Sequence, residues 1–189
     1  WIAPLAEAGV TITPLESANA GVLIPWTAHV ADRHAGTPLK RIAVRLSGEP
    51  ETAAIRGEAV ITKGGLEGGA IYALNPRIRA ALRSGPAPLL LDLRPDLETS
   101  ALAGQLARGK AKQSLSTLLA KAAKLSPAAI AVLRDGHGAA LPRDPAALAA
   151  SIKAVPLRVT ALASLARAIS TAGGIARDAH KDRLMLKAK

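Results

Sequence analysis

The stretch GEAVITKGGLEGGAIYAL, residues 57–74, says more about the fold than any other part of the chain. An apolar, strand-like segment runs into a loop that holds Gly64, Gly65, Gly68 and Gly69, and a short segment compatible with a helix follows. Clustered glycines allow positive φ angles or a close approach of the backbone to another surface. We therefore expect this loop to lie against another part of the protein or against a bound group.

Outward from this loop, several short segments alternate apolar and polar residues, which is typical of half-buried strands. In residues 41–46, Ile42, Val44 and Leu46 share one face, and Arg41, Ala43 and Arg45 share the other. Residues 89–93 and 155–160 repeat the pattern, and Leu184 and Leu186 indicate a last short strand. Short strands separated by turn residues favour an antiparallel sheet or a small barrel.

Between these strands, residues 97–153 have helical periodicity. Leu115, Leu118, Leu119 and Ala122 share one helical face. Three pairs, Asn75-Pro76, Ser126-Pro127 and Asp144-Pro145, resemble an N-cap followed by proline at the first helical position. The helix after Ser126 is expected to reach Leu133, with His137 in a turn over residues 135–138.

The sequence thus predicts an α+β fold, a small antiparallel β-barrel or sheet with an inserted helical subdomain. Its parts are a β-rich framework over 1–96, the helical subdomain over 97–153, and a return to the framework over 154–189. The strands at 89–93 and 155–160, which flank the insertion, should be neighbours in space.

Composition limits the chemistry that the chain can perform. Among its 189 residues there is no cysteine, which excludes disulfides, thiolate metal sites and a thiol nucleophile. There is no phenylalanine, so the core must be aliphatic. No apolar stretch approaches the roughly 20 residues that cross a bilayer, and a cytoplasmic protein without a membrane fits best. Because the chain begins at Trp1 rather than methionine, we expect a fragment of a longer protein.

The net charge of +11 raises the alternative of a non-catalytic basic module that binds nucleic acid or an acidic protein partner. The basic residues are spread along the chain, however, and three aromatic residues offer poor stacking platforms for single strands. Nucleic acid is therefore the weaker prediction.

No catalytic residue is evident from the sequence. The four histidines, at positions 29, 34, 137 and 180, have none of the spacings typical of metal ligands, so no metal site is expected. No order of residues suggests a Ser-His-Asp arrangement.

The glycine clusters allow two interpretations each. Gly64, Gly65, Gly68 and Gly69 could cradle a phosphate or a flavin, or they could form a tight strand-to-helix turn; their spacing is not that of a dinucleotide fingerprint. Thr171-Ala172-Gly173-Gly174-Ile175 could be a turn that closely approaches an interface, or a helix end closed by glycine.

Several stretches together resemble the BaiN-like, aminoacetone-oxidase-like flavoproteins, a family of NAD(P)/FAD-dependent oxidoreductases. The resemblance rests on residues 57–74 together with the stretches AGTPLKRI (35–42), LDLRPD (91–96), KQSLST (112–117), LSPAAI (125–130) and STAGGI (170–175). They occur in the order typical of the family and span nearly the whole chain.

The resemblance implies the substrate or cap domain of a FAD-dependent oxidoreductase, not expected to be active alone. FAD would be held mainly by a flavin-binding domain of the same polypeptide, and NAD(P)H and a small-molecule substrate would be the other reactants. By the same comparison, Thr171, Gly173 and Gly174 should lie near the junction with the flavin domain. We extend that expectation to Gly64, Gly65, Gly68 and Gly69.

Overall fold

The protein is described by a computed structural model, in which residues 1–110, 112–138 and 141–176 are placed. The strands are β1 (Ile12–Asn19), β2 (Val22–Leu23), β3 (Pro38–Leu46), β4 (Ile55–Thr62), β5 (Gly65–Glu67), β6 (Ala87–Asp92), β7 (Val155–Val159), β8 (Ala161–Leu162) and β9 (Ser170–Ile175). The α-helices are α1 (Ile2–Glu7), α2 (Ala28–Arg33), α3 (Gly69–Tyr72), α4 (Asn75–Leu82), α5 (Thr99–Ala107), α6 (Leu115–Lys121), α7 (Pro127–His137) and α8 (Pro145–Lys153). Short 3₁₀ turns occur at Glu51–Ala53 and Leu165–Arg167.

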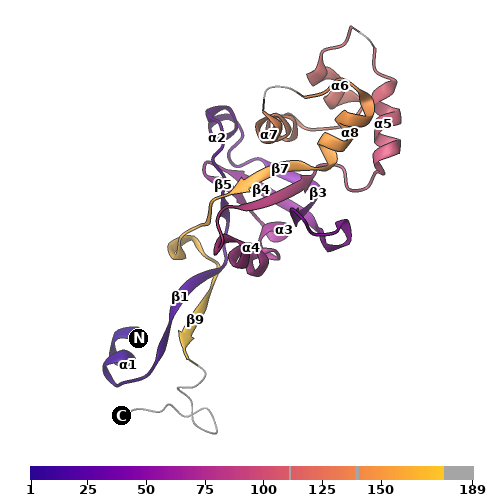
Figure 1. Ribbon diagram of the computed structural model, residues 1–189. Coiled ribbons are helices and arrows are strands. Elements are labelled where there is room, and N and C mark those ends of the chain that lie inside the picture. Colours follow the sequence, from indigo (N-terminus) through magenta and orange to yellow (C-terminus); the bar gives the residue numbers. More distant parts are fainter. Residues whose placement is uncertain (111, 139–140, 177–189) are drawn as a thin grey trace.

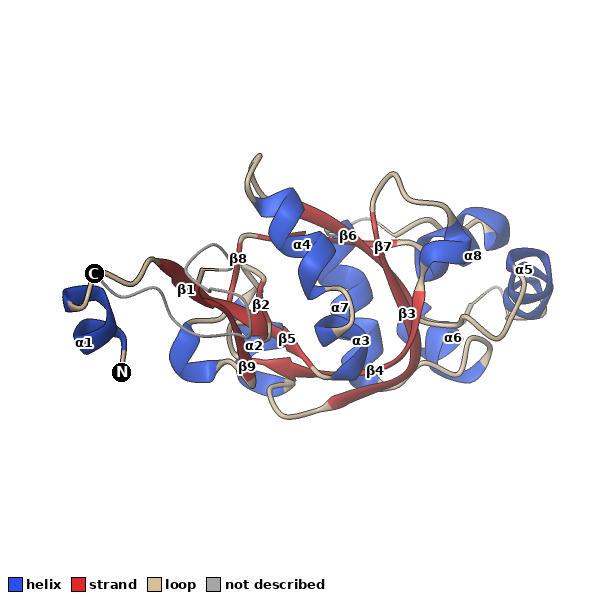
Figure 2. Cartoon of the chain, turned by 90° about the horizontal axis from the view of Figure 1, so that it is seen from below, coloured by secondary structure: helices blue, strands red, loops and turns tan. Residues whose placement is uncertain are grey.

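Seven strands form one curled antiparallel sheet in the order β7-β6-β3-β4-β5-β2-β8 (Figures 1 and 2). Its two edge strands, β7 and β8, are consecutive in the chain and are separated only by Thr160. The sheet therefore curls back on itself through a bend of the chain, although no ladder closes it into a complete barrel. The predicted α+β class, with a barrel-like antiparallel sheet, is confirmed.

Helices α5 to α8 lie between β6 and β7 in the chain and form a group at one end of the molecule (Figure 1). The flanking strands pair directly, from Ala87 opposite Val159 to Leu91 opposite Val155, as expected. The side chains of Ser126 and Asp144 cap α7 and α8 by accepting hydrogen bonds from backbone N–H groups. Helix α7 continues beyond Leu133, so the expectation of a turn around His137 is wrong.

His137 lies instead in the last turn of α7. There its ring nitrogen Nε2 forms a hydrogen bond with the backbone carbonyl of Ser151 in α8, at 2.9 Å. Gly138, at a φ of 71°, follows the last helical residue, so the helix ends four residues beyond the predicted Leu133. Tertiary contact with the neighbouring helix, absent from any local sequence pattern, accounts for the extension.

The core is aliphatic and continuous from the sheet into the helical part. Leu89 and Leu91 of the sheet, Ile78 of α4 and Leu133 of α7 are all fully buried in the same cluster. Helices α3 and α4 pack against the sheet from the side that Figure 2 shows in front. Because the helical part shares this core, the division at residues 97 and 153 stays a prediction.

β1 and β9 form a separate two-stranded antiparallel ribbon that leads away from the main sheet, with α1 at its far end (Figure 1). The ribbon pairs the first and last strands of the described chain, Ile12 opposite Ile175 and Asn19 opposite Ser170. The strand predicted at Leu184 and Leu186 lies outside the described residues.

Candidate functional site

The glycine segment at 57–74 is a strand hairpin rather than an open loop. β4 turns through Lys63 and Gly64 into the short strand β5, which pairs with both β4 and β2. A Cβ atom on Gly65 would lie 1.8 Å from the carbonyl oxygen of Val22, so only glycine allows the two strands to approach. Gly68 has a φ of 120° and precedes α3, which explains the second glycine.

Gly64 and Gly69 have no such structural reason. A Cβ atom on Gly69 would meet nothing within 4 Å, and one on Gly64 would meet only the Leu23 side chain, at an ordinary 3.5 Å. Gly64 lines a hollow of about 620 Å³. The hollow lies beside the root of the ribbon, by which we mean the end where Asn19 pairs with Ser170. Gly21, Ser164 and Arg167 line the same hollow, so it joins the β4–β5 turn to the segment after β8.

Thr171, Gly173 and Gly174 belong to β9, so they form neither the turn nor the helix end that the sequence suggested. Gly173 has a φ of 93°, and a Cβ atom there would lie 2.1 Å from the carbonyl oxygen of Pro14 in β1. Close strand pairing therefore requires this glycine. The first predicted glycine set surrounds β5 of the seven-stranded sheet and the second belongs to β9 of the ribbon, and the structure does not gather them into one constellation.

Exposed apolar side chains lie near the root of the ribbon. Leu23, Leu165 and Ile169 are 40%, 44% and 68% exposed, which is unusual for large aliphatic residues in this chain. Ile169 donates its backbone N–H to Asn19, the last residue of β1. We call Leu23, Gly64, Leu165 and Ile169 the ribbon-root surface.

A second pocket, of about 410 Å³, lies where the sheet meets the helical part. We call it the junction pocket. Its walls come from the start of β3, the segment after β6, the α6–α7 connection and the first turn of α7. Its residues are Pro38, Leu39, Lys40, Arg41, Ile42, Leu93, Arg94, Asp96, Lys124, Leu125, Ser126 and Ala129.

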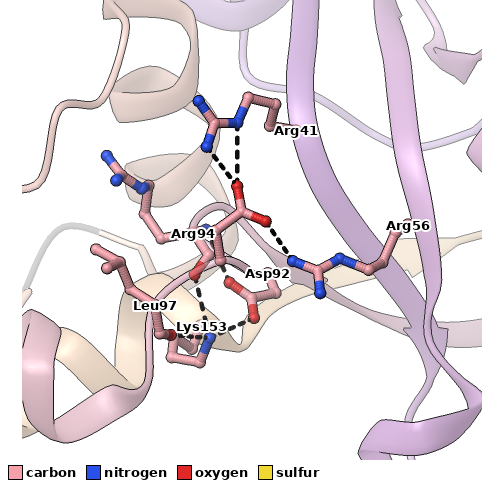
Figure 3. Close-up of polar contacts among 7 residues, drawn as sticks. Arg41, Arg56, Asp92, Arg94, Leu97 and Lys153 are labelled. Carbon is pink, nitrogen blue, oxygen red and sulfur yellow. Dashed lines mark hydrogen bonds and ion pairs between the residues drawn. The ribbon is translucent and has the colours of Figure 1, made fainter.

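A network of charged side chains stands beside this pocket (Figure 3). The Lys153 ammonium of α8 donates to Asp92 Oδ2 at 2.7 Å, to the carbonyl of Leu97 at 2.8 Å and to that of Arg94 at 3.2 Å. All three of its donors are thereby used. The pair ties the end of the helical part to the end of β6, and both side chains are largely buried.

The aspartate at position 96 bridges two strands of the sheet. Its carboxylate accepts from Arg41 of β3, at 2.7 and 3.0 Å, and from Arg56 of β4. Hydrogen bonds from Arg41 hold the pKa of Asp96 below its ordinary value of 3.8. Burial has the opposite effect on Asp92 and raises its pKa, although hydrogen bonds from Lys153 and from the Arg94 backbone oppose the rise.

Sequence reasoning missed this charged network and the junction pocket. Arg41, Arg94 and Lys124 lie far apart in the chain, so no local pattern brings them together. The segment LDLRPD at 91–96 was noticed as a family-like stretch, and its two aspartates are the signal that could have indicated a polar junction.

The matching family model is described as the HI0933-like protein barrel and H2TH domain, and it covers residues 16–170. The chain belongs to this family. The matched range contains the whole seven-stranded sheet and helices α5 to α8. The HI0933-like proteins are a family related to FAD-dependent oxidoreductases. Among curated proteins, none matches the chain.

The HI0933-like domain does not itself form a dinucleotide-binding unit in its described residues. Every ladder there is antiparallel, whereas such a unit needs parallel strands joined by a helix. Close contacts within the chain also explain Gly65 and Gly68 of the first predicted set and Gly173 of the ribbon. The residues present therefore do not fit a complete FAD site.

Two further findings concern the same described residues. No group of three or more histidine, aspartate or glutamate side chains stands together there as metal ligands would. None of the described helices combines the length and apolar character needed to traverse a lipid bilayer.

Proposed function

We propose that the chain is the substrate or cap domain of a FAD-dependent oxidoreductase, and that its ribbon-root surface faces the flavin-binding domain of the same polypeptide. Membership of the HI0933-like family carries this proposal. In the intact protein FAD would supply the hydride chemistry, with NAD(P)H and a small molecule as the other reactants, while this domain would shape and cover the pocket.

The ribbon supports the proposed attachment. Because β1 and β9 pair with each other, a single pair of strands can join the domain to a neighbour at one place. The exposed Leu23, Leu165 and Ile169 lie at the root of that ribbon. Aliphatic side chains exposed in one region are typical of a surface that another domain covers.

Among the glycines that we predict to lie near the flavin, Gly64 and Gly69 are the most useful to replace. Replacing Gly65, Gly68 or Gly173 would disturb the fold directly, because a side chain there meets backbone atoms or an unsuitable φ. Gly64→Ala and Gly69→Ala leave the fold intact, so any effect on flavin reports contact. Thr171 is exposed on β9 and can be tested in the same way through Thr171→Ala.

The experiment is to express the gene's full reading frame and to measure flavin absorbance. We expect a yellow protein. The Gly64→Ala, Gly69→Ala double variant should lower flavin occupancy or slow flavin reduction severalfold. Gly104→Ala is the matched control, because a Cβ atom there, in α5 of the helical part, also meets nothing within 4 Å.

Two results would count against the proposal in different ways. A colourless full-length protein would contradict the flavoprotein role as a whole. A yellow protein in which the glycine variants and Gly104→Ala behave alike would keep that role but reject Gly64 and Gly69 as flavin contacts, and with Gly64 the ribbon-root surface as the flavin-facing side.

A further inference from the structure

We propose that the junction pocket binds the phosphate group of a small phosphate monoester. The inference does not depend on the flavin role, because it rests on different residues. Four basic side chains line the pocket, Lys40, Arg41, Arg94 and Lys124, against the single carboxylate of Asp96. That carboxylate is also shared with Arg56 outside the pocket, so the lining keeps an excess of positive charge.

The backbone beneath two of these basic residues is unusual. Arg41 has a φ of 55° and Lys124 a φ of 54°, and they are the non-glycine residues with positive φ in the described part of the chain. Such conformations are strained for residues with a side chain and persist where the surrounding structure determines them. Both residues line the same pocket, although they are 83 positions apart in the chain (124 minus 41).

The fold explains how each strained residue is held. The β3–β4 ladder has a bulge between Leu39 and Ile42, and this irregularity brings Lys40 and Arg41 to the pocket. Lys124 lies in the α6–α7 connection, where Leu125 donates its backbone N–H to the carbonyl of Leu119. Two unrelated elements thus present cations to the same space.

The two arginines are oriented before any ligand arrives. Arg41 is held by Asp96, and Arg94 donates from Nη1 to the backbone carbonyl of Ala123. Lys40 and Lys124, in contrast, make no ion pair with any described residue. Oriented guanidinium groups beside uncommitted ammonium groups suit a doubly charged, multidentate anion.

The remaining lining favours a small molecule over a nucleic acid. Leu39, Ile42, Leu93 and Leu125 are at most 6% exposed and form an apolar floor for a short carbon chain. No aromatic residue lines the pocket, so bases would have no stacking surface. A volume of about 410 Å³ is the size of a small-ligand site.

The proposal is tested by calorimetric titration of the chain with inorganic phosphate and with n-butyl phosphate, at constant ionic strength. We expect both to bind, and butyl phosphate more tightly because its chain covers the apolar floor. The Lys40→Gln, Lys124→Gln double variant should weaken both affinities about tenfold or more, since each lost contact is a charged hydrogen bond.

The matched control is Lys110→Gln with Lys121→Gln. Both are exposed lysines of the helical part outside the pocket, and the control removes the same two charges. Its affinities should stay within about twofold of the parent chain, because distant surface charges are screened. Circular dichroism checks that both variants are folded.

Three results would overturn the proposal. One is no measurable binding of either phosphate probe. Another is equal weakening in the pocket variant and the control, which would mean general attraction to a basic protein. The last is binding of a single-stranded oligonucleotide that the pocket variant loses while neither phosphate probe binds, which would assign the pocket to nucleic acid.

Discussion

At the scale of single residues, Asn75 shows how a local signal can be present and its role still be misread. The sequence Asn75-Pro76 predicts an N-cap, but Asn75 is the first residue of α4 and is completely buried. Its side-chain carbonyl accepts the backbone N–H of Ala20 at 2.7 Å, and its amide donates to Ile71. The residue therefore satisfies a backbone group 55 positions away, which no local pattern contains.

Asn75→Ala should destabilise the protein by about 2 kcal/mol, because it leaves the buried N–H of Ala20 without an acceptor. The measurement is urea unfolding followed by circular dichroism. Asn19→Ala is the control, since the Asn19 side chain bonds Ser170 at an exposed position, and its effect should stay within about 0.5 kcal/mol. Equal losses in the two variants would contradict the structural role given to Asn75.

At the scale of elements, the predictable features were those encoded by nearby residues. The caps at Ser126 and Asp144 and the alternation at 155–159 are local, and the structure confirms them. The strands β2, β5 and β8 have two or three residues each, and they exist only through pairing with distant partners. The junction pocket is formed by three segments that lie far apart in the chain, so sequence reasoning could not predict it.

The two aspartates of the 91–96 segment should respond oppositely to acid. The folded-state pKa of Asp92 is raised, so this carboxyl favours folding increasingly as the pH falls from above that pKa to below 3.8. The folded-state pKa of Asp96 is lowered, so its stabilisation is present above 3.8 and is lost as the pH falls through its folded pKa.

These two predictions are checked by measuring the free energy of unfolding between pH 7 and 3. The measurement compares the parent chain with the Asp92→Asn and Asp96→Asn variants. The parent should gain stability relative to Asp92→Asn on acidification and lose its advantage over Asp96→Asn. The second effect should be small and salt-sensitive, because the Arg41–Asp96 pair is exposed. Differences that change in the same direction with pH would show that the two environments are not distinct.

At the scale of the whole molecule, a single aliphatic core joins the barrel-like sheet to the helical part. We therefore expect one cooperative unfolding transition rather than two. Trp26 reports on the sheet, since its indole N–H donates to the carbonyl of Gly65 at 3.0 Å. The helical circular dichroism signal reports mainly on α5 to α8.

In a Trp1→Tyr variant, which leaves Trp26 as the single tryptophan, thermal midpoints from fluorescence and from circular dichroism should coincide. The substitution itself is mild because Trp1 is 64% exposed. Midpoints separated by several degrees would instead establish the helical segment as an independent folding unit, in line with the division predicted from sequence.

The slender pair β1–β9 has a mechanical consequence. A two-stranded ladder lacks the third strand that stiffens a sheet, and this one is interrupted by two irregularities in register. We therefore expect the molecule to bend mainly in this ribbon, while the seven-stranded sheet and its helices move together as one rigid body. The orientation of that rigid body relative to a neighbour that holds the ribbon would then be set by contacts at the ribbon-root surface and not by the ribbon itself.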